Sequence, residues 1–356
     1  MKKKNLPPLL LASRDSLLAL AQTIEAAIRL EKVGFTPKIA ALKTAGDLKL
    51  DSPLYRVADQ GTKEGRAFFT RELDDALITG RADAAVHSFK DLPAEKIDGI
   101  SNPILFSETS TADILLSTDP LSLAEGGKNY TIGTSSLRRI HQLGFAWPYA
   151  KTVTLRGNIV TRLRKLIEKH DSINAILIAE AGFKRMKEFM GIPVEKYAHF
   201  LDEATLEHLT IELEHFKTYL SQKLYTHALP ESKFPTAPGQ GVLAFQFSEK
   251  ERHKFTEHLD EIFPEHPRTA ARALLERSVM TGLETGCHAP LGVSAHYTNG
   301  DTFHVSLCFS KSTTTSPVGF ANSVFIERTT LSADALVDEV RRPFETIYWW
   351  GLNDVT

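Results

Sequence analysis

Cysteine is scarce in this chain of 356 residues, which contains only Cys287 and Cys308. Two cysteines are too few for a disulfide scaffold of this size, so a reducing compartment fits. Long apolar runs are missing too: no stretch reaches the roughly 18 apolar residues that predict a membrane-spanning helix. The basic start, with lysines at positions 2–4, is typical of a signal peptide, but the apolar run behind it already ends at Ser13. We therefore expect a cytoplasmic protein.

An excess of charge of either sign is also missing. The 42 Lys and Arg residues nearly balance the 44 Asp and Glu residues and leave a net charge of -2. Nucleic-acid-binding domains are usually strongly basic, so this class of function is disfavoured. The phosphate-binding motif GxxxxGKS/T and the dinucleotide-binding motif GxGxxG do not occur, which argues against a nucleoside triphosphate or dinucleotide ligand. The length and the 42% of hydrophobic residues predict a soluble protein of two or three domains.

Acidic residues are absent from residues 131–167, although this tract is rich in basic ones. A solvated helix face usually mixes the two signs, so the tract predicts a binding site for anions. Arginine binds carboxylate or phosphate with two parallel hydrogen bonds, and helix starts add to the attraction. Few aromatic residues accompany the charges, so a small polyanion is favoured over RNA. The basic residues of the tract are Arg138, Arg139, Lys151, Arg156, Arg162, Arg164 and Lys165.

Strand, turn and helix alternate through the first two thirds of the chain, which predicts an α/β fold with largely parallel sheets. The predicted strands are 9–12, 37–42, 84–86, 113–117, 130–133, 152–155, 175–179 and 242–247. The last of these follows the rigid turn 235–241 and can return to the first sheet.

From residue 249 onward the order of elements changes. A predicted helix at 269–284 is followed by alternating strands at 293–296 and 303–309, which the hairpin dipeptide Asn299-Gly300 joins. A further strand at 320–327 and a closing helix at 333–347 complete a small α+β domain with an antiparallel sheet. We thus predict three domains: residues 1–112 with 228–249, residues 113–227, and residues 250–356.

The stretch at residues 83–93 crowds polar and bulky side chains behind a short buried strand. Open α/β sheets bind ligands at the carboxyl ends of their strands, so Asp91 is a candidate catalytic carboxylate. Taken alone, an Asp before Leu-Pro is more often a turn former or a helix cap. A similar strand, turn and helix at residues 9–30 offers an anion site with Arg14 as the counter-charge, unless Ser13 or Asp15 merely caps the helix.

Cys287 follows a glycine in a loop at a predicted helix end, where a thiol can be exposed and reactive. A buried, inert cysteine is the ordinary alternative. Cys308 lies in an alternating strand and is expected in the core. A nucleophilic pair of Cys287 with His288 is disfavoured, because adjacent side chains point apart.

Five motifs occur in the order found in one enzyme family, and on these motifs the chain resembles the porphobilinogen deaminase (hydroxymethylbilane synthase) family from about residue 9 onward. The motifs are HSFKDLP at 87–93, IGTSSLRR at 132–139, LRGN at 155–158 with TRL at 161–163, PGQG at 238–241 and Gly286-Cys287. The resemblance implies three domains, of which the first two are similar to periplasmic binding proteins. The active site would lie between these two, and the third domain would hold a covalent cofactor.

The resemblance also implies the chemistry. In this family a dipyrromethane is attached by a thioether to the cysteine that matches Cys287, and it primes the addition of four porphobilinogen units. Each unit loses ammonia, and hydrolysis then releases hydroxymethylbilane. Deamination gives an electron-poor azafulvene, which a carboxylate beside the pyrrole nitrogen would stabilise, and Asp91 matches the family's catalytic aspartate. The substrate carries an acetate and a propionate group, for which the basic tract would supply partners.

The residues that the resemblance implies fall into two sets. The set that binds the cofactor is Cys287 (covalently), Ser88, Lys90, Asp91, Thr134, Ser136, Arg138, Arg139 and Arg156. The set that binds the substrate is Arg14, Ser16, Gln22, Arg156, Arg162 and Arg185. We expect a monomer with a small-molecule substrate, without a metal and without a nucleic-acid or membrane partner.

The chain departs from the family pattern in several places. Residues 65–69 read GRAFF where the family has a sequence close to Gly-Lys-Gly-Leu-Phe, Leu17 replaces a common proline, and His288 replaces a glutamine. The glycine-bracketed residues 61–66 predict a mobile loop beside the site. Residues 191–229 contain an insertion, within which leucines at helical spacing predict an amphipathic helix that packs on its own domain.

Because Asp91, Cys287 and the arginines are present, we expect an active enzyme. The alternative is a catalytically inactive ligand-binding module of the same fold that binds small polycarboxylates. Such a module would need neither Cys287 nor Asp91.

Overall fold

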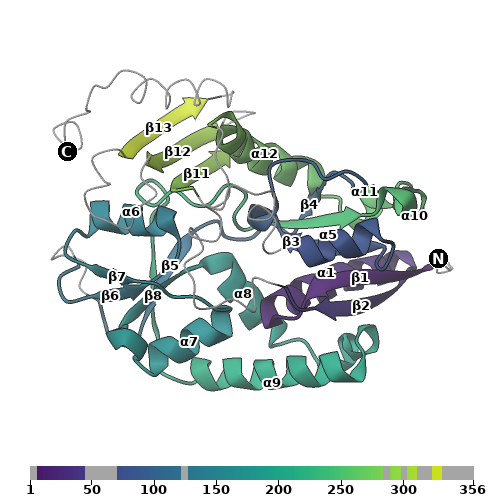
Figure 1. Cartoon of the computed structure of the whole chain (residues 1–356), viewed down its shortest axis with the longest axis horizontal. Coiled ribbons are helices and arrows are strands. Elements are labelled where there is room, and N and C mark those ends of the chain that lie inside the picture. Colours follow the sequence, from purple (N-terminus) through teal and green to yellow (C-terminus); the bar gives the residue numbers. More distant parts are fainter. Residues whose placement is uncertain are drawn as a thin grey trace.

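Three β-sheets organise the computed structural model (Figure 1). It describes residues 6–44, 70–121, 127–283, 289–297, 303–310 and 323–330, with the backbone alone for 267–268 and 323–330. The predicted loop at 61–66, the hairpin dipeptide at 299–300 and the closing helix at 333–347 lie outside these residues. We call the parts built on the three sheets the first, second and third domains.

The first sheet has the strand order β2-β1-β3-β10-β4. These strands are β1 (Pro8–Arg14), β2 (Thr36–Leu42), β3 (Ala84–Ser88), β4 (Ile104–Phe106) and β10 (Leu243–Phe247). Strand β1 pairs in parallel with β2 and β3, whereas β10 is antiparallel to both of its neighbours, so only β10 opposes the common strand direction. The predicted return of the strand at 242–247 to the first sheet is confirmed.

The second sheet has the order β7-β6-β8-β5-β9 and repeats this plan. Its strands are β5 (Asp113–Ser117), β6 (Thr131–Gly133), β7 (Lys151–Val153), β8 (Ala175–Ala179) and β9 (Tyr225–Ala228). Only β5 runs against the other strands. The chain therefore crosses from the first sheet to the second between β4 and β5, and returns between β9 and β10.

Helices cover both faces of each sheet. In the first domain these are α1 (Leu17–Val33) and α5 (Arg71–Ile78). In the second they are α6 (Leu137–Ala146), α7 (Ile159–Ile167) and α8 (Glu180–Phe189).

The apolar run of β5 shows why both faces need cover, because its side chains alternate between two cores. Ile114 and Leu116 lie in a core with Leu163 of α7, whereas Leu115 lies in another with Leu143 of α6. The first of these cores also contains residues of α1, so apolar packing continues from the first domain into the second.

The third domain packs α12 (His266–Gly282) on an antiparallel sheet of order β11-β12-β13. Its strands are β11 (Leu291–Tyr297), β12 (Phe303–Ser310) and β13 (Ser323–Thr330). Two sheets of mostly parallel strands and one small antiparallel sheet thus confirm the predicted fold class.

Two short helices precede the third domain, α10 (Arg252–Phe255) and α11 (Leu259–Ile262). The rings of Phe255 and Phe263 pack against the ring of Phe245 of β10, edge to face and tilted respectively, so this segment joins the core of the first domain. The domain boundary at residue 249 stays a prediction. No helix in the described part of the chain combines the length and the apolar character that crossing a membrane requires.

Candidate active site

The turn that carries Asp91 follows β3 directly, at the carboxyl end of that strand. It is a single 3-10 turn, η1 (Phe89–Asp91), in which Phe89 is buried while Lys90 and Asp91 are half-buried. Gln22 on α1 donates a hydrogen bond from Nε2 to Ser88 Oγ over 3.1 Å. The structure therefore brings Gln22 and Ser88, two predicted ligand residues, together beside Lys90 and Asp91.

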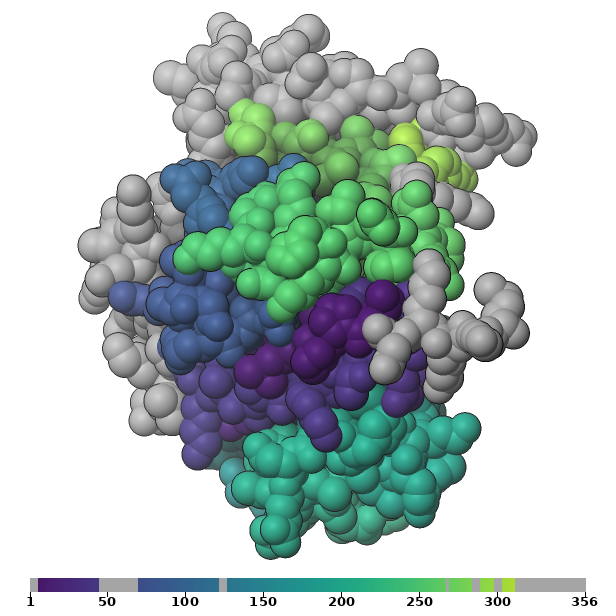
Figure 2. Space-filling model, turned by 90° about the vertical axis from the view of Figure 1, so that its right-hand side faces the viewer, coloured from purple at the N-terminus to yellow at the C-terminus, as the bar shows by residue number. Residues whose placement is uncertain are grey.

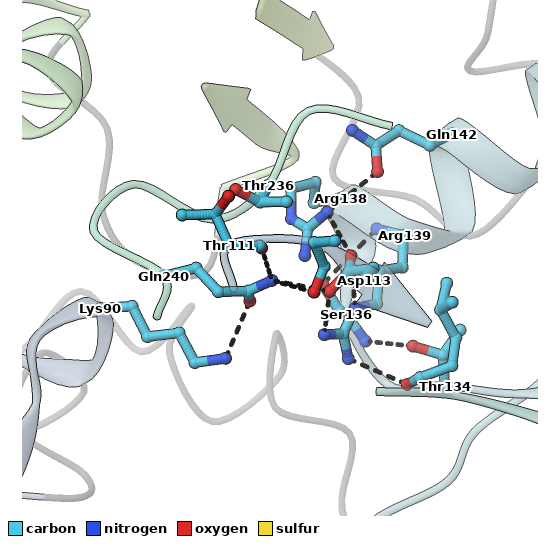
Figure 3. A network of polar contacts seen from close by, with 12 residues as sticks. Lys90, Thr111, Asp113, Thr134, Ser136, Arg138, Arg139, Gln142, Thr236 and Gln240 are labelled. Carbon is cyan, nitrogen blue, oxygen red and sulfur yellow. Dashed lines mark hydrogen bonds and ion pairs between the residues drawn. The ribbon is translucent and has the colours of Figure 1, made fainter. Parts of the chain in front are cut away.

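Asp113, the first residue of β5, lies buried between two arginines of the basic tract (Figure 3). Its Oδ2 accepts from Arg139 Nε at 3.1 Å, and its Oδ1 accepts from Arg139 Nη2 at 2.7 Å. Arg138 Nη1 forms an ion pair with Oδ2 at 2.8 Å. Burial alone would raise the pKa of the Asp113 carboxyl, but the two guanidinium charges outweigh it and hold this pKa well below its usual range. Two arginines of the basic tract at residues 131–167 thus pair with a carboxylate that precedes the tract in the sequence.

Gln240, in the PGQG turn, links this carboxylate to η1 (Figure 3). Its side chain donates from Nε2 to Asp113 Oδ1 at 2.9 Å and accepts at Oε1 from Lys90 Nζ at 3.0 Å. Burial lowers the pKa of Lys90 to about 8, although the neighbouring Asp91 charge acts in the opposite direction. Lys90, Asp91 and the arginine pair therefore form one electrostatic cluster.

The hydroxyl-rich turn before α6 organises the start of that helix. Ser136 is the N-cap, and its Oγ accepts from the Arg139 backbone N–H at 3.5 Å. Its own N–H donates to Thr134 Oγ1 at 3.3 Å, and Ser135 Oγ donates to the Leu155 carbonyl at 2.7 Å. The side chains of Thr134 and Ser136 thus shape the helix start from which Arg138 and Arg139 project.

Arg156 and Arg162 flank the tight turn before α7. Asn158 caps this helix, because its Oδ1 accepts from the Thr161 backbone N–H at 2.8 Å. Arg162 donates from Nε to the Gly157 carbonyl at 2.8 Å. Burial lowers the pKa of Arg156, and burial together with the charges of Arg139 and Arg156 lowers the pKa of Arg162 to about 10. Asp91 acts on Arg162 in the opposite direction.

The cluster carries an excess of positive charge. Within the described residues it holds five cationic side chains and two carboxylates, a formal excess of three charges: Lys90, Arg138, Arg139, Arg156 and Arg162 against Asp91 and Asp113. Several of these groups are buried, and buried charges need counter-charges. Anions with more than one carboxylate or phosphate group match this environment.

Arg14 is the last residue of β1, at the edge of the sheet where β3 also ends. Its positive charge acts on His87 of β3. Burial, reinforced by Arg14, lowers the pKa of His87 to about 4, so this imidazole is neutral near pH 7. His87 Nε2 has no hydrogen-bond partner among the described residues. Neither Ser13 nor Asp15 caps α1; the N-cap is Ser16, whose side chain makes no capping bond.

Arg185, a predicted substrate ligand, stands apart from this cluster. Arg185 donates from Nη2 to the main-chain carbonyls of Ser107 and Gly241, at 2.8 Å for Gly241, so it binds the two segments that connect the domains. Its substrate-binding role stays a prediction. Cys287 lies outside the described residues, and Cys308 is a buried strand residue as predicted.

Side chains of α12 hold the site from the third domain, and these were not predicted from the sequence. Arg277 donates to the carbonyls of Phe89 and Leu92, each at 2.6 Å, and its guanidinium lies 4.3 Å from the Phe89 ring centre. Glu276 accepts from the Gly239 backbone N–H at 2.7 Å. Two features of the sequence could have indicated these contacts. One is the set of charged residues among the apolar ones of the predicted helix at 269–284, and the other is Asp113, the single charged residue of an apolar strand.

Comparison with known proteins gives consistent results along the chain. Residues 9–256 match the family model described as porphobilinogen deaminase, dipyromethane cofactor binding domain, and residues 270–311 match porphobilinogen deaminase, C-terminal domain. A porphobilinogen deaminase of Nitratidesulfovibrio vulgaris strain Miyazaki F is 35% identical over 297 residues, covering 83% of this chain and 80% of its own. The protein of the same name from strain Hildenborough is 33% identical over 300 residues, covering 83% and 81%.

Among solved structures, an ancestral arginine-binding protein matches 75% of this chain and 92% of its own. Its sequence is 11% identical and the TM-score is 0.34. This likeness carries no argument about function, and the fold rests on the strand pairing described above.

Proposed function

The chain belongs to the porphobilinogen deaminase family, enzymes of tetrapyrrole biosynthesis, and from this premise we propose that it joins four porphobilinogen units head to tail and releases hydroxymethylbilane. The observation that carries the proposal is the excess of buried positive charge around Asp91. Porphobilinogen brings an acetate and a propionate group on every ring. A growing chain of such rings is the kind of polyanion that this cluster would neutralise.

Different cationic residues would bind different carboxylates of the ligand. Arg138 and Arg139 carry two charges against the single carboxylate of Asp113, so together they keep one positive charge for a ligand. Arg156 and Arg162 would pair with the carboxylates of the incoming ring. Arg14, with the N-cap residue Ser16 and with Gln22 of α1, would bind on the side of the first domain.

Asp91 would be the catalytic carboxylate. In each cycle the carbon–nitrogen bond of the aminomethyl group breaks and ammonia leaves. A carbon–carbon bond then forms to the free α-carbon of the preceding pyrrole, which loses a proton. A carboxylate beside the pyrrole nitrogen stabilises the positive charge of the azafulvene and can accept that proton.

The residues present also fit a covalently held dipyrromethane, which when bound supplies the free pyrrole carbon for the first addition. Cys287 would hold it through a thioether. Its carboxylates would meet Lys90, Arg138, Arg139 and Arg156, the same cations that carry the buried excess charge. Cys287 belongs to the segment that joins α12 to β11, and α12 contacts η1 through Arg277.

The test combines intact mass with turnover. Protein purified from its own host and denatured should exceed the mass of the bare chain by two linked pyrrole units, and Cys287→Ser should remove the excess. A chain of bare mass that gains nothing on incubation with porphobilinogen or hydroxymethylbilane would instead support the ligand-binding module. We also propose that the protein acts in the cytoplasm as a monomer. Sedimentation of the loaded protein would check the oligomeric state.

Asp91→Asn keeps the shape of the side chain and removes its charge. We expect this variant to bind substrate and to lose turnover by about 100-fold or more, the usual contribution of a general acid or base. The exposed Asp98→Asn on the same loop is the matched control. Turnover near that of the unaltered protein would remove Asp91 from the catalytic role.

A further inference from the structure

One segment of the second domain lies along both of the first two domains, on the side away from the third domain (Figure 1). It comprises the 3-10 turns η4 (Val194–Lys196) and η5 (Ala198–Phe200) and the helix α9 (Glu203–Leu220). In Figure 2 its teal surface meets the purple surface of the first domain. We call residues 194–220 the strap. Neither the catalytic cluster nor the three-sheet plan requires it.

Apolar side chains fix the strap to the second domain. Phe216 of α9 is fully buried and meets the ring of Phe183 on α8 edge to face, with 6.1 Å between the ring centres. Tyr197, just before η5, packs against Phe189 at the end of the same helix, with 5.0 Å between the ring centres. Burial of large rings contributes strongly to packing, so this attachment is part of the folded core.

Polar contacts connect the strap to the first domain. Lys38 on β2 donates to the His199 carbonyl at 2.6 Å, and the His199 ring lies 2.9 Å from a carboxylate oxygen of Glu31 on α1. Further along, His208 of α9 donates from Nε2 to the Asp15 carbonyl at 3.0 Å. Asp15 stands between Arg14 and Ser16, two predicted substrate ligands.

We propose that the strap positions the turn at residues 14–16 relative to the second domain, and that His208 is the positioning residue for this turn. Carboxylates of one ligand would be held by Arg14 on the first domain and by Arg156 and Arg162 on the second. The distance between these cations therefore depends on how the domains are held. Two-domain binding folds usually move about their connecting segments, and the strap adds a further contact between the domains that opposes this movement.

The arrangement of contacts explains why His208 matters more than its exposed position suggests. The Asp15 backbone N–H donates to the Leu42 carbonyl at 3.2 Å, and the bond from His208 to the Asp15 carbonyl adds a second contact to the backbone from which Arg14 and Ser16 project. His208 is itself held in place by α9, where Leu209 beside it is fully buried. The contact thus transmits the position of the second domain to the ligand residues of the first.

The proposal rests on the proposed function for its kinetic part, so the test has two independent readouts on the full, cofactor-loaded chain. The variants are His208→Ala, His208→Gln and the double variant Lys38→Met, His199→Ala. The first readout is hydrogen exchange of the peptide that covers residues 13–20, which needs no substrate. The second is the KM and kcat for porphobilinogen.

We expect faster exchange in this peptide for His208→Ala and for the double variant. We also expect a KM raised about three- to tenfold, the effect of one lost hydrogen bond, with kcat nearly unchanged. Glutamine can donate from its amide, so His208→Gln should recover part of both effects. The matched control is His215→Ala, because this exposed histidine of α9 pairs with Glu212 on the same helix.

Unaltered exchange in the peptide 13–20 of His208→Ala would overturn the proposal, whatever the double variant shows. An equal effect of His215→Ala would also overturn it, since the cause would then be a general change in α9. If the unaltered protein did not turn over porphobilinogen, the proposed function would fail, and the exchange readout would still decide whether the strap holds the turn.

Discussion

Asp113 shows how the site keeps a positive charge available while it buries arginines. Two guanidinium groups share its carboxylate, and Gln240 occupies one further acceptor position on it. Removal of one partner from a buried ion pair costs about 3 to 5 kcal/mol, because the remaining charge loses its counter-charge. The carboxylate thus stabilises Arg138 and Arg139 in the fold without neutralising both of them. The remaining charge is what a carboxylated ligand would meet.

Lys90 makes ligand binding sensitive to alkaline pH. Burial lowers the pKa of this ammonium group to about 8, so it loses its proton, and its attraction for carboxylates, as the pH rises past 8. We expect kcat/KM of the loaded enzyme to fall at a pH of 8 or above, because cofactor carboxylates beside Lys90 would keep this group protonated to higher pH. Lys90→Arg should move this alkaline limb to higher pH, because a guanidinium group stays protonated.

Lys90→Met should instead lower kcat/KM already at neutral pH and remove the limb. The pH profile of initial rates from pH 6 to 10 checks this, with the exposed Lys96→Met as the control. An alkaline limb that persists unshifted in both Lys90 variants would assign it to another group.

His87 should make stability sensitive to acid. Its pKa is about 4 in the folded protein and near 6.5 when unfolded, so between these values the unfolded chain binds more protons and stability falls as the pH falls. At pH 4.5 the loss relative to pH 7 amounts to about 2 to 3 kcal/mol from this residue. Burial raises the pKa of Asp74 to about 6, and this carboxyl group works in the opposite direction over the same range.

The comparison of variants separates the two groups. Denaturant unfolding at pH 7 and pH 4.5 should show a smaller loss of stability on acidification for His87→Gln than for the unaltered protein. His253→Gln, at an exposed position, should leave the loss unchanged. Parallel losses in all three proteins would contradict the assignment to His87.

The PGQG turn and α12 enclose η1 from two sides. Arg277 binds the carbonyls on either side of Lys90 and Asp91, and Glu276 holds the Gly239 backbone N–H. Gly239 has a φ of +77°, and the ring of Phe89 occupies the place of any added Cβ. Close packing at this glycine therefore determines where the catalytic turn lies.

Gly239→Ala should both destabilise the fold and impair turnover. We expect the free energy of unfolding to fall by about 2 to 4 kcal/mol, from the left-handed backbone and the overlap with Phe89. Gly80→Ala is a closely matched control, since Gly80 has a φ of +72° but open space around it. It should cost only about 1 kcal/mol of backbone strain. Equal losses in the two variants, measured by denaturant unfolding, would show that the contact with Phe89 is unimportant.

Local signals predicted the elements of this molecule well. Strands β5 and β8 span Asp113–Ser117 and Ala175–Ala179, as predicted, because a short apolar run between turns marks a buried strand locally. The contacts that assemble the site were not predictable in this way. Gln240 meets Asp113 across 127 positions of sequence, and Arg277 meets Phe89 across 188. The basic tract predicted an anion site, but not that Asp113 would already supply one carboxylate to it.

The uncompensated charge should govern the stability of the whole molecule. Without its cofactor the cluster has five cations against two carboxylates, and the repulsion between the cations opposes the packing of the first two domains against each other. We therefore expect Cys287→Ser, isolated as the bare chain, to unfold at a lower temperature than the loaded protein. A small polycarboxylate such as citrate, present at about 100 times its Kd, should stabilise the bare chain by about 3 kcal/mol.

Thermal unfolding with and without citrate, at matched ionic strength in chloride, measures this effect. Arg162→Met removes one charge of the excess, so in the Cys287→Ser background it should raise the unfolding temperature without citrate and reduce the gain with citrate. Lys184→Met removes an exposed charge of α8 and should change neither value. A citrate effect that chloride reproduces, or that Arg162→Met leaves intact, would mean that general screening stabilises the protein. The buried cluster would then not be the anion site that holds the two domains together.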